Sequence, residues 1–436
     1  MFDEESGSMK DVSSLMKERL KADQIALLDL IAETAAHQQV SVYVVGGFVR
    51  DLLLNIQNLD IDLVVEGDGI NFSEILAEKF NGRTKNYEKF GTSTLTLKGQ
   101  SHIDVATART EYYSHPAALP KVEPSSIKSD LARRDFTINS MAIKLNGQGV
   151  FPLIDFFDGE MDLKDGSIRI LHDRSFIEDP CRIFRAIRFE QRFKFCIEDQ
   201  TRGFMKSAIE SDLINQLSGK RLLNEVKLLL KEPDPVRCVD RMKAFSLLQF
   251  FASDISNDDS RWLVMKKIDS VLIWSKMISM PKKPETWLVY FLGLFVAVKD
   301  AVFEQAVERL RFPVKISNRM RSDREHFIKA RRGLNEGREP GPSEIYDIFS
   351  ELSAEAVILL LAACSSERVN KYAALYFNEY YTSAKTKLTG DDLIGMGVEP
   401  GPIFNDVFKA LRDARVNGQV ASRDEEVLFV ESQFLK

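Results

Sequence analysis

The sequence has 436 residues with 44% hydrophobic composition and a formal net charge of −6. This length exceeds one ordinary core, so we expect two or more globular domains. The apolar runs are too short to cross a bilayer, and the acidic, polar first residues do not resemble an export signal. Four cysteines without metal-ligand spacing argue against a zinc site or a disulfide framework and predict buried thiols. A cytoplasmic protein is expected, and a polyanionic partner would require a local basic surface.

The first part of the chain is predicted to combine helices and strands. Residues 1–38 carry apolar positions at helical spacing and predict a helical lead-in. The segments SVYVV, DIDLVV, TSTLTL and SHIDVAT predict strands, and FVRDLLL and SEILAEKF predict helices. Pro116, Pro120 and Pro124 then predict a loop, because proline lacks an N–H donor.

The remainder of the chain has a helical pattern. Length and periodicity predict helices at CRIFRAIRFEQRF, KRLLNEVKLLL, WLVYFLGLFVAV and AEAVILLLAAC. The expected fold class is therefore α+β, with a mixed α/β unit of about 120 residues followed by an almost wholly helical region.

Two acids lie in the otherwise apolar segment NLDIDLVV. On a strand Asp60 and Asp62 would share a face about 7 Å apart. Such a pair alone would indicate a solvated strand edge. Asp104, within the apolar strand HIDVAT, favours a site, because a desolvated acid requires a compensating cation or donor. Three acids on adjacent strands suit two Mg²⁺ ions shared with substrate phosphates, which predicts phosphoryl or nucleotidyl transfer.

A glycine pair precedes this acidic strand. Gly46 and Gly47 lie where a predicted strand turns into a helix, which leaves backbone N–H groups available to a phosphate. Arg50, one turn later, could meet a phosphate bidentately. A tight turn is the ordinary use of such glycines, and their position directly before the acids favours nucleotide binding.

Four ordered segments resemble the signature motifs of the class II tRNA nucleotidyltransferase and poly(A) polymerase family. They are GGFVRDLLLNIQNLDIDLVV, RRDFTINSMAI, DFFDGEMDLKDGSIRILHD and EDPCRIFRAIRF. The resemblance extends to LTGDDLIGMGVEPGPIFNDVFKAL near the C-terminus. It implies a nucleotidyltransferase head at residues 39–170, a helical neck with a base-recognition motif at 171–255, and a helical, RNA-binding body and tail at 256–436.

The resemblance also implies roles for individual residues. Asp60 and Asp62 would hold the metal ions. Asp104, the third acid of the strand pattern, is expected to lower the pKa of the 3′-hydroxyl of the RNA or to accept its proton. The residues implied to bind the sugar and triphosphate are Arg133, Arg134, Asp135 and Asn139.

The motif EDPCR can also be argued from its chemistry. Asp179 and Arg182 are three residues apart near Pro180, so on a helix they would lie side by side. A carboxylate accepts and a guanidinium donates, which matches the amine and bare ring nitrogen of cytosine and adenine and rejects uracil and guanine. An ordinary surface ion pair is the alternative. Arg185 and Arg188 continue the same helix as phosphate or packing contacts.

The segment RLRFPVKISNRMRSDREHFIKARR is strongly basic, with Phe312 and Phe327 interleaved. Most such runs are solvated helix faces, but an enzyme acting on RNA would use them to contact the RNA backbone. The candidate RNA-binding residues are Arg319, Arg321, Lys329, Arg331 and Arg332.

The loop EYYSHPAALPKVE departs from the pattern of CCA-adding members. Those members carry an arginine pair where this sequence has Ala117 and Ala118. The loop resembles that of long bacterial members with an upstream CBS region, which are similar to dedicated A-adding enzymes. This sequence contains no such region, so the chain is either the catalytic portion of a longer protein or a short relative.

We therefore predict a Mg²⁺-dependent enzyme that adds nucleotide to the 3′ end of tRNA from ATP. Addition of the terminal A is favoured, and addition of both C and A, with CTP as a further substrate, stays open. A poly(A) polymerase using the same site and a catalytically inactive RNA-binding protein are the alternatives.

Overall fold

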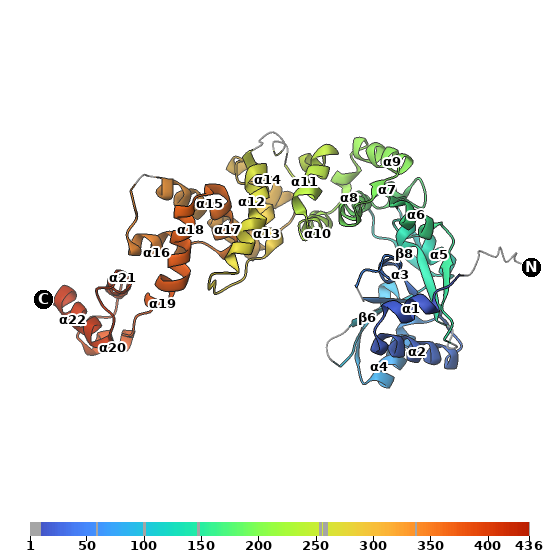
Figure 1. The fold of residues 1–436 in the computed structure, drawn as a ribbon, viewed down its shortest axis with the longest axis horizontal. Helices are drawn as coiled ribbons and strands as arrows, with labels where there is room; N and C mark the ends of the chain where they lie inside the picture. Colours follow the sequence, from blue (N-terminus) through green and yellow to red (C-terminus); the bar gives the residue numbers. More distant parts are fainter. Residues whose placement is uncertain are drawn as a thin grey trace, which may run out of the picture. The chain divides into compact units, whose positions relative to one another are not determined.

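The computed structural model describes residues 10–57, 60–98, 102–145, 149–252, 255, 260–335 and 338–435. The chain divides into two compact units, Met1–Arg221 and Leu222–Lys436, which we describe separately (Figure 1). The finer division into lead-in, head, neck, body and tail stays a prediction. Among the described residues, none of the helices has the length and apolar content needed to span a membrane.

The first unit contains a mixed sheet and short helices. Its strands are β1 (Lys10–Asp11), β2 (Ser41–Val45), β3 (Ile61–Glu66), β4 (Arg83–Tyr87), β5 (Thr92–Thr96), β6 (His102–Thr107), β7 (Arg109–Tyr112), β8 (Lys121–Pro124), β9 (Met141–Leu145), β10 (Pro152–Asp155), β11 (Ser167–Ile168) and β12 (Cys196–Ile197). Its α-helices are α1 (Ser13–Arg19), α2 (Ala22–His37), α3 (Gly47–Leu53), α4 (Gly69–Phe80), α5 (Ile127–Ala132), α6 (Gly159–Asp165), α7 (Ser175–Glu178), α8 (Cys181–Phe193) and α9 (Asp199–Glu210). Helix α10 (Gly219–Leu229) spans the boundary between the units.

Eight strands form one sheet in the order β1-β10-β9-β2-β3-β6-β5-β4. Only the β3 and β6 pair is parallel; the other neighbours are antiparallel. Strand β4 is therefore an edge strand, three strands away from β3. Two small ladders, β7 with β8 and β11 with β12, complete the unit.

One face of the sheet is covered by α2 and α4, which contact each other. Helix α2 contacts β2 and β9, and α4 contacts β3, β4, β5 and β6. The alternating pattern of the strands explains this burial: Leu63 and Val65 on β3 and Ile103 and Val105 on β6 are all buried.

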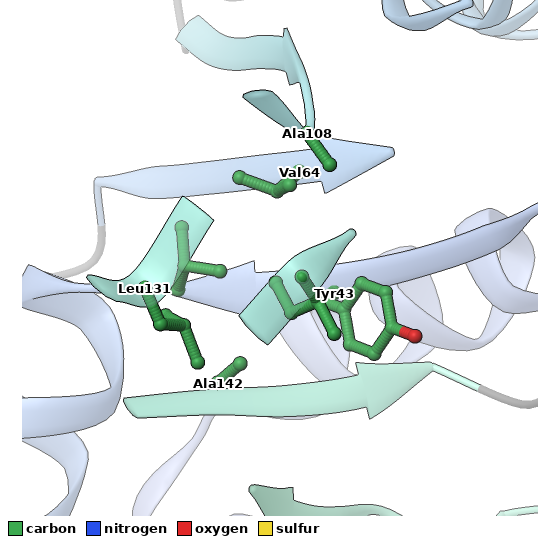
Figure 2. Close-up of a cluster of buried hydrophobic side chains, with 7 residues drawn as sticks. Tyr43, Val64, Ala108, Leu131 and Ala142 are labelled. Carbon is green, nitrogen blue, oxygen red and sulfur yellow. The ribbon is translucent and has the colours of Figure 1, made fainter. Parts of the chain in front are cut away.

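The opposite face is only partly covered. Figure 2 shows Leu131 of α5 beside Tyr43, Val64 and Ala142 from three neighbouring strands. Helix α5 thus covers the part of this face around Val64. Asp62, two residues earlier on β3, lies on the same face outside this apolar cluster.

The expected fold class is confirmed, and the predicted strands and helices are present. Strands β7, β9, β10, β11 and β12 were not predicted, and three further differences concern the lead-in, β4 and the proline-containing segment. Lys10–Asp11 joins the sheet beside β10, so the lead-in is more than a helical segment. Strand β4 was not predicted, because its residues RTKNY are nearly all polar. Pro124 ends β8, which pairs with β7, so part of the proline-containing segment is a strand rather than a loop.

The second unit is helical in the part of the chain that the structure describes. Its helices include α11 (Pro235–Ala244), α12 (Ser260–Ser275), α13 (Thr286–Leu294), α14 (Asp300–Arg309), α15 (Val314–Asn335), α16 (Pro342–Ser350), α17 (Ala354–Cys364), α18 (Glu367–Leu375), α19 (Tyr381–Ser383), α20 (Gly390–Gly395), α21 (Ile403–Val416) and α22 (Arg423–Phe434). Helix α17 contacts α12, α13 and α15 and is buried over most of its length. A smaller apolar cluster joins α20, α21 and α22.

Helix α15 carries the basic segment that the sequence offered as an RNA contact. Phe312, just before this helix, and Phe327 on it are buried, so the expectation of aromatic side chains interleaved with surface cations is wrong. Arg319 pairs with the buried Glu355, and Arg321 pairs with Glu304 at 2.6 Å. These two arginines serve intramolecular packing, because neighbouring helices present carboxylates to them. Lys329, Arg331 and Arg332 are exposed, and RNA contact through them stays a prediction.

The four cysteines are free thiols, and Cys181 and Cys238 are buried as expected. Cys196 is exposed, so the expectation of buried thiols is wrong there. It lies on β12, a strand of two residues whose other member, Ile197, takes the buried position.

The Leu131 contact gives the first prediction. Leu131→Ala would leave a cavity under β2, β3 and β9 and lower the free energy of unfolding of the first unit by about 2 to 5 kcal/mol. Hydrogen exchange at the amides of Tyr43 and Val64 should report this loss. All three tryptophans, Trp262, Trp274 and Trp287, lie in the second unit, so their fluorescence transition should not move.

Leu119→Ala is the matched control, since Leu119 is 65% exposed. Equal protection losses for the two variants would contradict the assignment of Leu131 to the core.

Candidate active site

The three acids predicted from the sequence lie on one edge of the first unit. Asp62 on β3 is directly opposite Asp104 on the parallel strand β6. The hydroxyl of Thr94 on β5 donates to Asp104 Oδ1 at 2.7 Å. Burial raises the pKa of Asp62 to about 6, and the charges of Asp104 and Asp60 raise it further against the opposing effect of Arg134. The three carboxylates are thus close enough to repel one another.

The burial of these acids differs from the expectation. Asp104 is exposed, because Ile103 and Val105 occupy the buried face of β6, so the premise that Asp104 is desolvated is wrong. Asp60 is also exposed and precedes the first residue of β3. Asp62 is the acid that is partly desolvated.

The surroundings of these carboxylates show whether they fit a divalent ion. No ready-made cluster of three or more Asp, Glu, His or Cys side chains occurs among the described residues. Within the same residues, neither Asp60 nor Asp62 has a hydrogen-bond or ion-pair partner, and Asp62 is partly buried beside like charges. Such a pair fits a hard cation, because the cation would supply the compensation that the protein does not.

A cavity of about 440 Å³ lies beside Asp62 within the first unit. Its described lining contains seven arginines and four acids, so it is positively charged. The lining is Gly46, Gly47, Arg50, Asp62, Glu111, Tyr113, Arg133, Arg134, Asp135, Asn139, Asp179, Arg182, Arg185, Arg188, Phe189 and Arg192. Every residue predicted to bind nucleotide is therefore brought to one cavity, and its charge suits a triphosphate.

The glycine turn admits one of these arginines. Gly46 has φ of +66°, and a Cβ there would lie 2.7 Å from Arg134 Nη1. A side chain at residue 46 would therefore be strained and would displace the guanidinium. The turn is needed both for its backbone conformation and for the close approach of Arg134.

Arg50 has a different role from the one predicted. It is buried, and its guanidinium is bonded to Asp51 Oδ1 through Nε at 2.8 Å and to Asn139 Oδ1 through Nη1 at 2.7 Å. It also lies over the rings of Phe189 and Phe193. The expectation that Arg50 meets a phosphate bidentately is wrong in this structure, because its donor fork is bonded within the protein. Its effect on the cavity is to join α3, α8 and the RRDFTIN segment.

One buried carboxylate orients two cavity arginines. Asp130 on α5 is fully buried, and its Oδ1 accepts from Arg133 Nε at 3.0 Å and Nη2 at 2.6 Å. Its Oδ2 accepts from Arg134 Nη2 at 2.9 Å. Burial alone would raise the pKa of Asp130, but the two guanidinium groups hold it below its ordinary value. The sequence contained a signal for Asp130, because Arg133 and Arg134 follow it by three and four residues, the spacings at which side chains can meet.

Asp135 and Asn139 form a second anchored group. Asp135 Oδ1 accepts from Asn139 Nδ2 at 3.0 Å, and Asp135 Oδ2 is 2.6 Å from Arg185. Burial opposes the charge of Asp135, but Arg185 and the Asn139 amide keep its pKa lowered. Arg185 is therefore oriented by an acid from the RRDFTIN segment. Arg188 is buried in the cavity lining, with its guanidinium over the ring of Phe189.

The candidate base-reading residues are anchored independently of each other. Asp179 is the extended residue that follows α7, and α8 begins at Cys181, so the prediction that Asp179 and Arg182 share a helix is wrong. The reason is that Pro180 caps α8 and leaves Asp179 outside it. Arg182 donates to Ser175 Oγ at 2.5 Å and to the Arg133 carbonyl at 2.7 Å. Both residues line the cavity, and the alternative of a surface ion pair between them is not observed.

Arg221 links Asp179 to the loop between β7 and β8. It donates to Asp179 Oδ1 at 2.7 Å and to the Ala117 carbonyl at 2.8 Å. At the start of the loop, Tyr113 donates to Glu111 Oε2 at 2.8 Å, and Glu111 Oε1 accepts from Arg133. The loop is thus tied at two points to groups of the cavity. Sequence reasoning missed Arg221, Glu111 and Tyr113, because their partners lie far away in the chain or carry no motif.

Comparisons with known proteins agree with this geometry. Residues 42–169 match the poly A polymerase head domain, and residues 194–258 match the probable RNA and SrmB-binding site of polymerase A. An A-adding tRNA nucleotidyltransferase of Halalkalibacterium halodurans is 30% identical over 99% of this chain and 97% of its own length. The chain belongs to the class II tRNA nucleotidyltransferase and poly(A) polymerase family.

Other members of this family extend the comparison. An A-adding tRNA nucleotidyltransferase of Geobacter sulfurreducens is 39% identical over 96% of this chain, which spans 48% of that longer protein. A CCA-adding enzyme in its apo form matches with a TM-score of 0.82 and 34% identity, covering 98% of this chain and all of the other. The Thermotoga maritima CCA-adding enzyme complexed with tRNA matches with a TM-score of 0.76 and 33% identity, covering 99% of this chain and all of the other.

The raised pKa of Asp62 predicts that the first unit is less stable because of its own site. Its folded-state pKa of about 6 exceeds the ordinary value of 3.8, so ionised Asp62 destabilises the metal-free fold above pH 6. Below about pH 4 both folded and unfolded states are protonated, and the penalty disappears. Asp62→Asn should stabilise the first unit at pH 7.5 by roughly 1 to 2 kcal/mol, reduced from the full shift because Asp62 is partly solvated.

Urea unfolding in EDTA at pH 7.5 and pH 4 checks this prediction, with the exposed Asp165→Asn as the control. A gain at pH 7.5 that persists unchanged at pH 4 would contradict the electrostatic cause.

Proposed function

We propose that this chain adds an adenosine residue to the 3′ end of tRNA that ends in CC, releasing pyrophosphate from ATP. The observation that carries the proposal is the arginine-rich cavity in which Asp62 and the pair Asp179 and Arg182 occur together. Nucleotidyl transfer requires three parts: an acid that binds metal, cations that bind phosphate, and groups that hydrogen-bond to a base. The names of the relatives in Halalkalibacterium and Geobacter support tRNA as the acceptor.

The arginines act by binding and orienting the triphosphate. Arg133 and Arg134 are held by Asp130, and Arg185 is held by Asp135, so their guanidinium groups are ordered before the nucleotide arrives. Preordered donors lose little freedom on binding and stabilise the charge that develops on the leaving pyrophosphate.

We assign Mg²⁺ binding to Asp60 and Asp62, on the grounds that neither has a hydrogen-bond or ion-pair partner among the described residues. The chemistry that two Mg²⁺ ions supply when bound is neutralisation of the triphosphate and polarisation of the 3′-hydroxyl. We assign to Asp104, which is exposed and accepts a hydrogen bond from Thr94, the uptake of the proton of that hydroxyl.

Base selection follows from the anchoring of Asp179 and Arg182. Asp179 Oδ1 is bonded to Arg221 and to the Cys181 amide at 2.9 Å, whereas Oδ2 has no partner among the residues described. That oxygen can accept from the exocyclic amine of adenine. Arg182, fixed by Ser175, can donate to the adjacent bare ring nitrogen. A base with a carbonyl and N–H in these positions would leave both groups unpaired, at a cost of roughly 10⁴-fold in rate.

The loop between β7 and β8 favours A over C. It carries Ala117 and Ala118, and Arg221 bonds it to the same Asp179 that would read the base. The A-adding relatives support this choice. A poly(A) polymerase would use the same cavity, and the match to a polymerase head domain keeps it as the second candidate.

A primer series tests the activity. Transfer RNA ending in the discriminator base, in C or in CC would be incubated with CTP, ATP or both, and resolved on a sequencing gel. We expect one added nucleotide, only with the CC end and ATP. A ladder of A residues would instead identify a poly(A) polymerase, and incorporation of C would contradict A addition alone.

The same assay tests the acids. Asp60→Ala/Asp62→Ala should lower incorporation of labelled ATP by at least about 10³-fold, because the ligands for both ions are removed. Retained incorporation would refute the assigned metal site. Asp165→Asn again serves as the control, since this exposed acid lies outside the cavity lining.

Removal of Arg221 tests the base-reading assignment. Arg221→Gln would free Asp179 and the loop, and we expect kcat/KM for ATP to fall roughly tenfold or more, with discrimination against GTP reduced. Arg237→Gln, which removes an exposed arginine paired with Asp234 in the second unit, is the matched control. If Arg221→Gln discriminates against GTP as strongly as the wild type, the contact between Arg221 and Asp179 does not contribute to base selection.

A further inference from the structure

The sheet face that carries Asp62 continues across β6, β5 and β4, where none of the described helices has a main contact with it. Strand register places Asp62, Asp104, Thr94 and Lys85 in one cross-strand row. Residues in register on neighbouring strands point to the same side of a sheet. Lys85 is thus on the face of Asp62, three strands away, at about 14 Å for a strand spacing of about 4.8 Å.

Two further rows flank the first on these outer strands. His102, Thr96 and Arg83 are in register on one side, and Ala106, Thr92 and Tyr87 on the other. The threonines are half-buried, and Arg83, Lys85 and Tyr87 are exposed. This surface, defined by Arg83, Lys85, Tyr87, Thr92, Thr94 and Thr96, is the outer sheet face.

The opposite side of the same strands packs against α4. Ser93 and Leu95 on β5 are buried, and Ser93 Oγ is 2.9 Å from Ser73 Oγ of α4. Asn86 of β4 donates to Glu74 of the same helix at 2.7 Å. Helix α4 thus accounts for one side of β4 and β5, and the outer sheet face has no helix of its own in the contacts of these strands.

The outer sheet face has the chemistry of an RNA-binding surface. Among the described residues, Arg83 and Lys85 have no carboxylate within ion-pairing distance, unlike Arg319 and Arg321 of the second unit. The Lys85 ammonium lies 5.4 Å from the centre of the Tyr87 ring. Unpaired cations suit phosphates, an exposed aromatic ring suits a nucleobase, and threonine hydroxyls suit ribose or phosphate oxygens.

The position of the nucleotide cavity decides which RNA segment this surface fits. The described lining of the cavity includes Asp62 but no residue of β4, β5 or β6. The two substrates of nucleotidyl transfer meet at the acids, so a triphosphate in the cavity leaves the β6 side of Asp62 to the acceptor. The outer sheet face is continuous with that side through Asp104.

We propose that the outer sheet face binds the last few nucleotides of the RNA acceptor strand, with Arg83 and Lys85 on phosphates and Tyr87 stacked on a base. The inference rests on the proposed function and specifies which surface holds its acceptor. The outer sheet face would bind RNA by charge complementarity and stacking, without base-specific hydrogen bonds. It would therefore set the affinity for the RNA strand and its direction, while the cavity selects the base.

The test compares steady-state kinetics of Arg83→Ala/Lys85→Ala with the wild type, using tRNA ending in CC at several KCl concentrations. We expect the KM for tRNA to rise about tenfold, with the KM for ATP unchanged, and the slope of log KM against log salt to fall by roughly one to two. Lys17→Ala/Lys21→Ala removes the same charge from exposed positions on α1 and just before α2 and is the matched control.

Tyr87 supplies a second, charge-independent readout. Tyr87→Ala should raise the KM for tRNA about fivefold, while Tyr87→Phe, which keeps the ring, should restore it. Circular dichroism establishes that each variant is folded.

The outcomes separate the inference from the function on which it rests. If wild-type protein adds A but the double variant keeps its KM for tRNA and its salt slope, the outer sheet face is not the acceptor site, and the proposed function stands. An equal rise in the KM for ATP would also overturn the inference, because it would indicate damage to the cavity. If the wild type transfers no nucleotide to tRNA, both proposals fail.

Discussion

The parallel register between β3 and β6 is the constraint on which the site depends. It sets Asp62 directly opposite Asp104. Helix α5 covers the same face around Val64 and leaves Asp62 and Asp104 outside the apolar cluster. A shift of either strand by one residue would turn its acid toward α4 and expose its buried apolar residues, such as Leu63 on β3 or Val105 on β6. The buried apolar residues of these strands therefore fix the position of the acids, and hydrophobic burial supplies the stability that like charges oppose.

The second organising feature is the use of buried carboxylates to hold arginines. Seven guanidinium groups in one cavity repel one another, and several are buried. Asp130, Asp135 and Glu111 each accept from at least one of them, which offsets the cost of desolvation and orders the side chains. Asp62 has no hydrogen-bond or ion-pair partner among the described residues, and burial, with the charges of Asp104 and Asp60, raises its pKa. Functional sites commonly retain this kind of uncompensated charge.

The sequence predicted four strands of the main sheet and most residues of the cavity, but it missed β9, the central strand beside β2. Alternation and apolar runs identified β2, β3, β5 and β6, because a strand buried on one or both faces has a recognisable pattern of apolar residues. Strand β4 has no such pattern, because its outer face is polar and Asn86, on the side of α4, is also polar and donates to Glu74. The same lack of periodicity explains why the outer sheet face could not be recognised before the strand order was known.

Several roles could not be predicted, because they depend on partners distant in sequence. Arg50 resembled a phosphate ligand until Asn139, 89 residues away, was found on its Nη1. Asp104 was expected to be buried because its strand neighbours are apolar, yet alternation turns it outward. Arg319 resembled an RNA contact until Glu355 was found beside it on another helix.

The sequence by itself determined the family and the fold class and predicted the acids, since ordered motifs and strand periodicity are local properties of the chain. Only the tertiary structure decided which charged groups are compensated, because each ion pair joins segments that folding brings together. It also decided that the row from Asp62 to Lys85 crosses four strands, since strand order and register arise from packing and are not written in any one segment.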